Sequence, residues 1–234
     1  MTGLPFDEFD ALTFDCYGTL IDWEAGIVTG LRAALGARLI DVTDDELLER
    51  FAASEAALEA GPYRPYRDIL GACLSEVAGL VGATPTEAER VRFGASVADW
   101  PAFEDSPAAL ASLSRRFRLG VLTNCDDDLF AASNERLGIA FDWVVTAQQA
   151  RGYKPRLANF ELALERIGLP RQRILHVAQS LFHDHVPAKE LGLTTVWINR
   201  RAGRPGAGAT PPASATPDAV FPDMRSFAAA ATAR

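Results

Sequence analysis

The chain is poor in the residues that would give it a disulfide framework, a metal centre or an affinity for polyanions. Its 234 residues include three cysteines, Cys16, Cys73 and Cys125, and three histidines. So few and widely spaced cysteines imply neither a disulfide framework nor a zinc site. Acidic residues outnumber basic ones by 31 to 23, and the formal net charge is −8. This charge argues against broad binding to nucleic acids or anionic membranes.

Long hydrophobic runs are also missing. No apolar run approaches the length of a membrane span, and the N-terminal stretch 1–7, which has an acidic and no basic residue, does not resemble a signal peptide. We therefore expect a cytoplasmic protein that binds neither nucleic acid nor membrane. The length suits one sizeable core, or a core with a small accessory domain.

Short apolar runs that alternate with helical stretches indicate an α/β fold. The predicted strands are residues 11–15, 119–124, 143–147, 174–178 and 194–199, followed by a short strand at 218–221 and a terminal helix from Met224. From the second strand onward the spacing is typical of βαβ units and a parallel, Rossmann-like sheet. Residues 201–217 are rich in Gly, Ala and Pro, which predicts an extended surface loop.

The first strand is separated from the second by about a hundred residues that read as helical. Thr43 and Glu46 form a capping-box pattern, and Thr84 precedes Pro85 and Glu87 as a second helix start. We predict that residues 21–97 form an inserted helical cap over the strand ends. Residues 1–20 and 98–234 then form the core domain.

Residues 13–24, TFDCYGTLIDWE, place Asp15 at the carboxyl end of the first strand, just before a turn. Ligand chemistry collects at such strand ends in open α/β sheets. The stretch resembles the opening motif of the haloacid dehalogenase superfamily, in its type II branch of L-2-haloacid dehalogenases and L-azetidine-2-carboxylate hydrolases. The resemblance implies that Asp15 is a nucleophile. It also implies that the backbone N–H groups of Cys16 and Tyr17, near Thr19, hold a substrate carboxylate.

Two further motifs follow in the family's order. Thr123 and Asn124 end the second strand, and Lys154 precedes a proline and a helix. The resemblance implies that Thr123 binds the substrate carboxylate and that Asn124 supports the leaving group. Lys154 would lie beside the nucleophile, lowering its pKa and offsetting developing charge. Taken alone, each motif is equally typical of a turn or a solvated loop. We interpret the acidic run 126–128 as the first turn of a helix, not as a metal site.

The fourth motif, residues 176–185, separates this chain from the superfamily's phosphatases. Ser180 and Asp184 match the phosphatase pattern Gly-Asp-Ser-x-x-x-Asp, but its metal-binding Asp is replaced by Gln179. Tyr17 likewise replaces the second acid of the phosphatases' Asp-x-Asp. A phenol with a pKa of about 10 cannot act as that acid, and an amide is a poor magnesium ligand. Both replacements predict chemistry without metal or other cofactor, with Gln179 and Ser180 at the substrate site.

The three histidines are not expected to bind one metal ion together. In a helix, His183 and His185 would point about 200° apart, and His176 lies in an apolar strand pattern typical of a core histidine. His183, beside Asp184, is either a general base for water or a structural residue. The sequence favours neither.

The cap departs from the dehalogenase pattern. Residues 51–54 contain no counterpart of the halide-binding Arg, so Arg50, Arg64 or Arg67 would have to replace it. Phe160 stands where the family has a substrate-site Tyr. Trp23, with Tyr63 and Tyr66, forms either an apolar lid over the substrate or ordinary cap packing.

The function implied by the resemblance is metal-independent hydrolysis of a small 2-substituted carboxylic acid, such as a 2-haloacid. Asp15 attacks carbon 2 and forms an ester, which water hydrolyses with help from Asp184 or His183. Ring opening of L-azetidine-2-carboxylate, a magnesium-dependent phosphatase and a non-catalytic interaction module are the alternatives. A homodimer is compatible with the resemblance.

Overall fold

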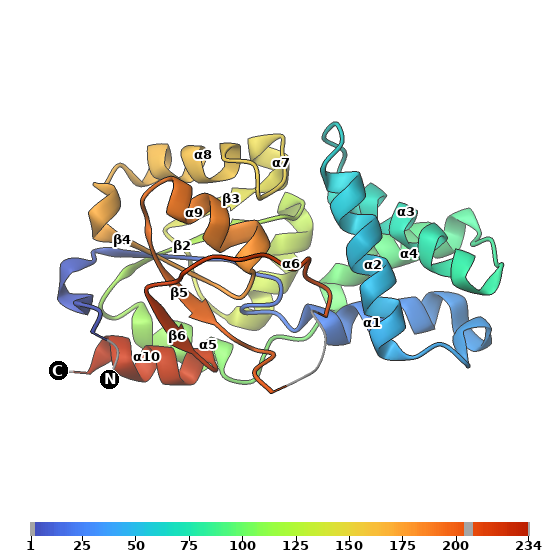
Figure 1. Ribbon diagram of the computed structural model, residues 1–234, viewed down its shortest axis with the longest axis horizontal. Helices are drawn as coiled ribbons and strands as arrows, with labels where there is room; N and C mark the ends of the chain where they lie inside the picture. The colour runs from blue at the N-terminus through green and yellow to red at the C-terminus, as the bar shows by residue number, and fades with distance from the viewer. Residues whose placement is uncertain (1–2, 204–207, 234) are drawn as a thin grey trace.

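A six-stranded parallel sheet forms the centre of the molecule (Figure 1). A computed structural model of the chain describes residues 3–203 and 208–233. The strands are β1 (Ala11–Phe14), β2 (Arg118–Thr123), β3 (Trp143–Thr146), β4 (Ile174–Ala178), β5 (Thr194–Ile198) and β6 (Ala219–Phe221). All neighbouring strands pair in parallel, in the order β3-β2-β1-β4-β5-β6. The prediction of an α/β fold with a Rossmann-like parallel sheet is confirmed.

The strand order reverses at β1, which positions the functional site. The chain moves from β1 outward to β2 and β3, and then returns to β4 on the other side of β1. In open α/β sheets, the crevice at the carboxyl ends of the strands beside such a reversal is where ligands bind. Asp15 follows β1 at this point.

Helices cover both faces of the sheet, which explains why all four residues of β1 are buried. The helices on one face are α5 (Ser106–Leu113), α6 (Asp127–Leu137) and α10 (Met224–Thr232); those on the other are α8 (Ala158–Ile167) and α9 (Val186–Glu190), with the short α7 (Ala147–Ala150) after β3. Leu12 and Phe14 pack on the first face, and Ala11 packs on the second. Asp127 and Asp128 lie in the first turn of α6, as predicted.

The helical insert lies at the right-hand end of the molecule in Figure 1. Its helices are α1 (Trp23–Leu35), α2 (Asp44–Glu59), α3 (Tyr66–Ala78) and α4 (Glu87–Ala95). The short turns of the chain are 3-10 helices at Phe6–Glu8, Gly36–Leu39, Gly79–Val81, Ser96–Asp99 and Arg171–Arg173, and a π-helical turn at Leu181–His185. The helical character of the insert is confirmed, whereas the division into 21–97 and the core ranges stays a prediction.

Capping explains where two of these helices begin. The predicted capping box of Thr43 and Glu46 starts α2. The predicted start at Thr84 is wrong, because Thr86 accepts the backbone N–H of Glu89 and forms a second capping box. The reciprocal contact of Glu89 with Thr86 satisfies a second backbone N–H, which a start at Thr84 does not provide.

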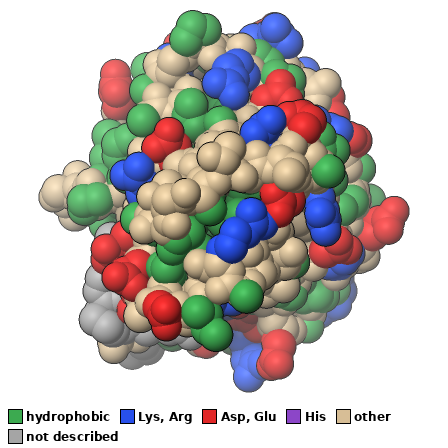
Figure 2. Space-filling model, turned by 90° about the vertical axis from the view of Figure 1, so that its right-hand side faces the viewer, with side chains coloured by type: hydrophobic (Ala, Val, Ile, Leu, Met, Phe, Trp, Pro, Cys, Tyr) green, Lys and Arg blue, Asp and Glu red, His purple; other side chains and the backbone are tan. Residues whose placement is uncertain are grey.

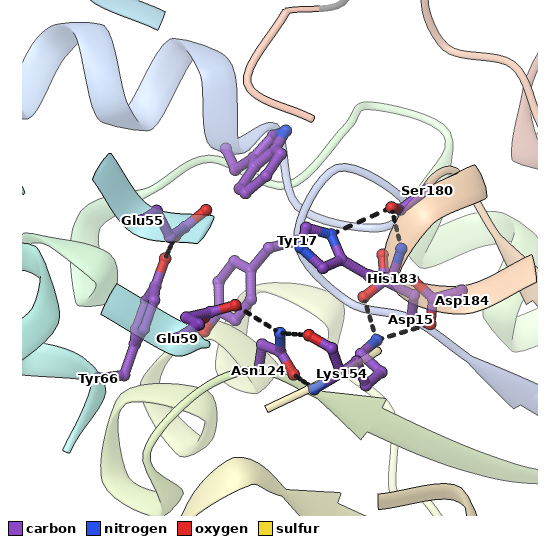
Figure 3. A pocket seen from close by; sticks show the side chains of 11 residues that line it. Asp15, Tyr17, Glu55, Glu59, Tyr66, Asn124, Lys154, Ser180, His183 and Asp184 are labelled. Atoms are coloured by element: carbon purple, nitrogen blue, oxygen red, sulfur yellow. Dashed lines mark hydrogen bonds and ion pairs between the residues drawn. The ribbon is translucent and has the colours of Figure 1, made fainter. Parts of the chain in front are cut away.

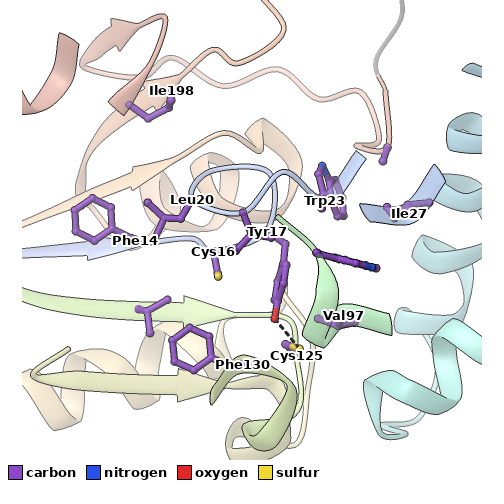
Figure 4. Close-up of a cluster of buried hydrophobic side chains, with 14 of the residues drawn as sticks. Phe14, Cys16, Tyr17, Leu20, Trp23, Ile27, Val97, Cys125, Phe130 and Ile198 are labelled. Carbon is purple, nitrogen blue, oxygen red and sulfur yellow. Dashed lines mark hydrogen bonds between the residues drawn. The ribbon is translucent and has the colours of Figure 1, made fainter. Parts of the chain in front are cut away.

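Core and insert share one hydrophobic cluster (Figure 4). Ile27 and Val97 lie in this cluster together with Phe14 of β1. The Tyr17 ring meets the Trp100 ring edge-on, with centroids 5.7 Å apart. The cap is therefore packed against the strand ends by apolar contacts.

The predicted surface loop at 201–217 is partly wrong. Residues 204–207 lie outside the described residues, but Gly208, Ala209 and Thr210 are buried. The backbone N–H of Ala209 donates to Glu24 Oε1 at 3.1 Å, and this half-buried acceptor holds the segment against the cap. All three cysteines are free and buried. None of the helices in 3–203 or 208–233 is long and apolar enough to cross a membrane.

Candidate active site

Asp15 lies at the centre of a buried charge network. Its Oδ1 accepts a hydrogen bond from Lys154 Nζ at 2.9 Å, and its Oδ2 accepts one from Thr19 Oγ1 at 2.6 Å. Thr19 Oγ1 in turn accepts the backbone N–H of Gln179 at 2.8 Å. Burial raises the pKa of the Asp15 carboxyl, and the positive charge of Lys154 opposes this rise. The network therefore fixes the orientation of both carboxylate oxygens.

Lys154 bridges two carboxylates. Its side chain is 1% exposed, and Nζ donates to Asp15 Oδ1, to Asp184 Oδ1 at 2.7 Å and to the carbonyl of Leu122 at 2.9 Å. These acceptors use all three donors of an ammonium group. Burial acts to lower the pKa of Lys154, but Asp15 and Asp184 outweigh it and raise the pKa. Lys154 thus lies within salt-bridge distance of Asp15, as the sequence predicted, and carries a positive charge at neutral pH.

Asn124 holds the backbone of Lys154 in place. Its Oδ1 accepts the Lys154 backbone N–H at 2.8 Å, and its Nδ2 donates to the Lys154 carbonyl at 3.0 Å and to Glu59 Oε2 at 3.1 Å. Both amide hydrogens of Asn124 are therefore already engaged. The predicted support of a leaving group by Asn124 requires one of these bonds to break.

Asp184 completes the network from the π-helical turn after β4. Its Oδ1 also lies 3.1 Å from His176 Nε2, and His176 Nδ1 lies 2.9 Å from Thr13 Oγ1. Burial acts to raise the pKa of Asp184, but Lys154 and His176 lower it below its usual range. Asp184 Oδ2 is buried without a hydrogen-bond partner among the described residues. His176 is buried, as a core histidine should be, and it also orients Asp184, which the sequence did not indicate.

His183 lies beside this network and is held by Ser180. Ser180 Oγ accepts the His183 backbone N–H at 2.9 Å and lies 3.1 Å from His183 Nδ1. Burial lowers the pKa of His183 to about 4, so the imidazole is neutral at neutral pH and can accept a proton. His185 instead contacts the carbonyl of Ala178 through Nε2 at 3.0 Å, so the two side chains do not converge.

A small cavity opens where these side chains meet the cap (Figure 3). Its volume is about 30 Å³, and it is lined by Asp15, Tyr17, Trp23, Glu55, Glu59, Tyr66, Asn124, Lys154, Ser180, His183 and Asp184. Eight of these are predicted site residues. Gly18, whose φ is +91°, lets the turn after Asp15 pass beneath Trp23, because a Cβ there would lie 3.0 Å from Trp23 Nε1. A substrate larger than a few atoms requires the cap to move.

The other predicted site residues lie outside the cavity lining. Thr19 contacts Asp15, and Thr123 Oγ1 is buried without a partner among the described residues. Gln179 Oε1 accepts a hydrogen bond from Thr210 Oγ1 at 3.2 Å. Phe160 packs edge-on against His176, with centroids 5.1 Å apart. The side chain of Cys16 belongs to the hydrophobic cluster.

The backbone at the end of β1 offers two free donors. Within the described residues, the N–H groups of Cys16 and Tyr17 have no hydrogen-bond acceptor. They follow Asp15 directly, at the strand end where the sequence predicted that a substrate carboxylate is held. The binding of a substrate carboxylate by these two N–H groups stays a prediction, which a structure with bound substrate would test.

The sequence reasoning missed the acidic side chains of the cap. It expected Arg50, Arg64 or Arg67 in the role of a halide-binding cation, but none of them lines the cavity. Glu55, Glu59 and Tyr66 line it instead. The signal was present in α2, where positions 55 and 59 continue the buried face formed by Leu47, Leu48, Phe51 and Ala52.

The residues at the strand ends do not fit a magnesium ion. Lys154 Nζ lies between Asp15 and Asp184, where a cation would bind both carboxylates. The Tyr17 hydroxyl is 3.0 Å from Ser133 Oγ and 3.3 Å from Cys125 Sγ (Figure 4), and its pKa is raised well above 10 by burial. Gln179 faces Thr210. These residues therefore do not form a magnesium site.

The fold and the buried charge network together define a protein with a parallel α/β core, an inserted helical cap and a buried Asp–Lys–Asp cluster at the strand ends. Residues 9–181 match the haloacid dehalogenase-like hydrolase family, and the chain belongs to that family.

Comparison with individual proteins places the chain near the L-2-haloacid dehalogenases. It is 24% identical to haloacetate dehalogenase H-2 of Moraxella sp. over 196 residues, which cover 82% of this chain and 87% of that protein. It is 32% identical over 108 residues to haloacid dehalogenase-like hydrolase domain-containing protein 3 of Danio rerio, and this match spans 45% of each chain. The solved structure of L-2-haloacid dehalogenase from Xanthobacter autotrophicus superposes with a TM-score of 0.77 at 20% identity, covering 94% of this chain and 97% of that one.

Proposed function

We propose that this hydrolase displaces the substituent at carbon 2 of a small carboxylic acid through an ester formed on Asp15, without a metal ion. The observation that carries the proposal is the position of Lys154 Nζ between Asp15 and Asp184, at 2.9 and 2.7 Å. A fixed ammonium opposes the rise in the pKa of Asp15 and lowers the pKa of Asp184, which favours the ionised forms that a nucleophile and a base require. The small cavity above Asp15 agrees with a small substrate.

In the first step, an Asp15 oxygen forms a bond to carbon 2, and the bond to the leaving group breaks with its electron pair on that group. The free N–H groups of Cys16 and Tyr17 hold the substrate carboxylate, with Ser180 beside them. Attack from the side of Asp15 inverts the carbon and directs the leaving group toward the cap. Lys154 remains paired with Asp184 while the charge on Asp15 is consumed.

In the second step, water attacks the acyl carbon of the Asp15 ester. Asp184, through its unpaired Oδ2, or the neutral His183 takes the proton from water. Lys154 offsets the oxyanion that develops on Asp15. Cleavage then releases a 2-hydroxy acid and restores the carboxylate.

A single turnover in ¹⁸O-water tests this proposal, with L-2-chloropropionate as a first substrate. Attack on the acyl carbon places solvent oxygen in the Asp15 carboxylate and leaves the first product unlabelled. Label in the first product instead overturns the ester and makes Asp15 at most a general base. The same assay in excess chelator distinguishes the metal-dependent phosphatase alternative, because the proposed reaction continues there.

The leaving group defines two versions of the proposal. The named activity of the Moraxella relative supports a halide. Opening of a cyclic amine such as azetidine-2-carboxylate is the second candidate. It is favoured by the cap side of the cavity, where Glu55, Glu59 and Tyr66 line the wall and the described residues supply no cation.

A further inference from the structure

His176 is a polar ring in an otherwise apolar strand. It lies in β4, whose other residues are Ile174, Leu175, Val177 and Ala178, and it is 0% exposed. All three histidines of the chain are buried, and none is visible on the surface of the cap end (Figure 2). Burying such a polar group is costly unless its hydrogen bonds are made. An apolar side chain would fill this place without that cost, so the imidazole calls for a physical reason.

Both ring nitrogens of His176 have a partner. Nδ1 lies 2.9 Å from Thr13 Oγ1, and Nε2 lies 3.1 Å from Asp184 Oδ1. An ionised carboxylate only accepts hydrogen bonds, so the contact with Asp184 requires a proton on Nε2. Thr13 Oγ1 has no other acceptor within residues 3–203 and 208–233, so its hydroxyl donates to Nδ1. Thr13 thereby selects the tautomer that can donate to Asp184.

The strands and a core helix fix the position of this ring. Thr13 and His176 are direct partners in the parallel pairing of β1 and β4. Phe160 of α8 packs edge-on against the imidazole, and Thr195 of β5 is the strand partner of His176 on its other side. Asp184, by contrast, lies in the π-helical turn after β4, and such turns are frequent at functional sites. A donor on a rigid sheet therefore holds a carboxylate that lies outside the sheet.

The contacts of Asp184 are divided unequally between its two oxygens. Lys154 Nζ at 2.7 Å and His176 Nε2 at 3.1 Å both contact Oδ1, whereas Oδ2 is buried without a partner among the described residues. With Lys154 alone, the carboxylate could turn so that either oxygen faces the ammonium. The second donor fixes Oδ1 from another direction, so Oδ2 remains the free acceptor. A free, fixed acceptor is what a general base for water requires.

We propose that His176 and Thr13 are positioning residues for the second step, which hold Asp184 Oδ1 so that Oδ2 takes the proton from water. This inference rests on the proposed ester on Asp15. Because formation of the ester needs no base, the two residues act on hydrolysis of the ester and not on its formation. The same arrangement makes Asp184, and not His183, the base.

The protons of this step balance. One O–H bond of water breaks as its oxygen bonds to the acyl carbon of the ester, and the proton moves to Asp184 Oδ2. When the bond between the acyl carbon and the product oxygen breaks, that oxygen takes the proton from Asp184. The water oxygen stays in Asp15, whose carboxyl group releases the remaining proton. His176 keeps its proton on Nε2 throughout.

Two substitutions of His176 separate positioning from packing. His176→Leu removes both ring contacts, whereas His176→Gln keeps an amide donor for Asp184. In a single turnover of L-2-chloropropionate, halide release measures formation of the ester, and the mass of the intact protein measures its decay. His176→Leu should release halide at the wild-type rate but slow ester decay by about tenfold or more, because a hydrogen bond to a charged group is lost. His176→Gln should restore much of the decay rate.

Thr13→Val tests the outer residue with a side chain of the same shape. It should slow ester decay by a smaller factor than His176→Leu, because the ring proton can then move to Nδ1. Thr195→Val is the matched control. Thr195 flanks the same ring, but its hydroxyl has no partner among the described residues, so this variant should keep the wild-type decay rate. Equal effects of the two valine variants overturn the proposal.

Two further readouts do not respond to a purely structural role. Burial acts to raise the pKa of Asp184, and Lys154 and His176 lower it. In His176→Leu the decline of ester decay in acid should therefore begin at a higher pH than in wild type, where Lys154 and the esterified Asp15 still face Asp184. Nitrogen-15 NMR of the wild type should show the His176 proton on Nε2, with the signals assigned by their loss in His176→Gln.

The outcomes distinguish this inference from the proposed function. Equal slowing of halide release and ester decay in His176→Leu overturns the positioning role and leaves the ester on Asp15 standing. A wild-type ring protonated on Nδ1, alone or together with Nε2, also overturns it, and this spectrum and Thr13→Val decide the matter if His176→Leu does not fold. Solvent label in the first product of the wild type overturns both proposals, because no ester then forms.

Discussion

The carboxylate of Asp126 accepts the backbone N–H of Tyr66 at 2.9 Å, so a core residue caps the first turn of the cap helix α3. The other oxygen of Asp126 accepts the backbone N–H of Arg67 at 3.1 Å. These are two of the N–H groups that a helix start leaves unpaired, and a negative charge there is stabilised by the helix dipole. Asp126 therefore sets the position of Tyr66, whose hydroxyl holds Glu55 at the cavity.

Replacing Asp126 with Ala should loosen the cap. We expect the free energy of unfolding to fall by about 2 kcal/mol, because a buried acceptor of two N–H groups is lost. Urea denaturation measures this change. Asp128→Ala is the control, because Asp128 also contacts Arg67 but its side chain is 69% exposed, and surface ion pairs contribute about 0–1 kcal/mol. Equal effects of the two variants would contradict the proposed anchoring.

Removing the charge of Lys154 should slow turnover strongly and also destabilise the fold. Lys154→Met leaves Asp15 and Asp184 as buried carboxylates without a counter-ion, which we expect to cost about 3–5 kcal/mol of unfolding free energy. The rate should fall by about 10²-fold or more. Lys189→Met is the matched control, since Lys189 pairs with Asp218 at 2.6 Å near the surface. A Lys154→Met variant that keeps wild-type turnover would refute the mechanism.

Glu55 should make stability depend on pH in an unusual direction. Its pKa rises from 4.5 to about 7 in the folded protein. A raised folded-state pKa contributes stability that is fully present below pH 4.5 and lost as pH rises through 7. The size of the shift corresponds to about 3 kcal/mol. Glu55→Gln should therefore be more stable than wild type at pH 8.5 and nearly equal to it at pH 4, by urea denaturation at each pH. A stabilisation that is the same at both pH values would contradict the assignment.

The fold was largely predictable because its signals are local. Buried strands such as Ile174–Ala178 are short, mainly apolar runs between turn residues. The capping box that begins at Thr43 is a pattern of four consecutive residues. The burial of Ala209 and Thr210 was not predictable from composition. It depends on acceptors supplied by Glu24 and Gln179, which are far away in the sequence.

The site was predictable where motifs lie at strand ends. The family resemblance placed Lys154 beside Asp15, and the fold agrees because parallel strands bring their carboxyl ends to one edge of the sheet. The contribution of the cap to the site was not predictable, because the docking of a helix depends on tertiary contacts. Glu59 reaches the cavity only because α2 lies beside Asn124 of the core. The spacing of apolar residues in α2 showed which face of the helix is buried. It did not show that the end of this face lines the cavity beside Asp15.

The division of roles between Asp184 and His183 can be decided by trapping the ester. Asp184 has an ionised carboxylate with one unpaired oxygen, so we expect it to be the main base for water. Asp184→Asn should then accumulate the Asp15 ester, seen as an added mass on the intact protein, while His183→Ala should slow its hydrolysis less. Burial lowers the pKa of His183 to about 4 and that of Asp184 is below its usual range. With either base, ester hydrolysis should therefore stay nearly constant from about pH 8 to 5, without the decline near pH 6.5 that an ordinary histidine gives. Loss of activity in both variants without accumulation of the ester would show that neither residue acts in the second step.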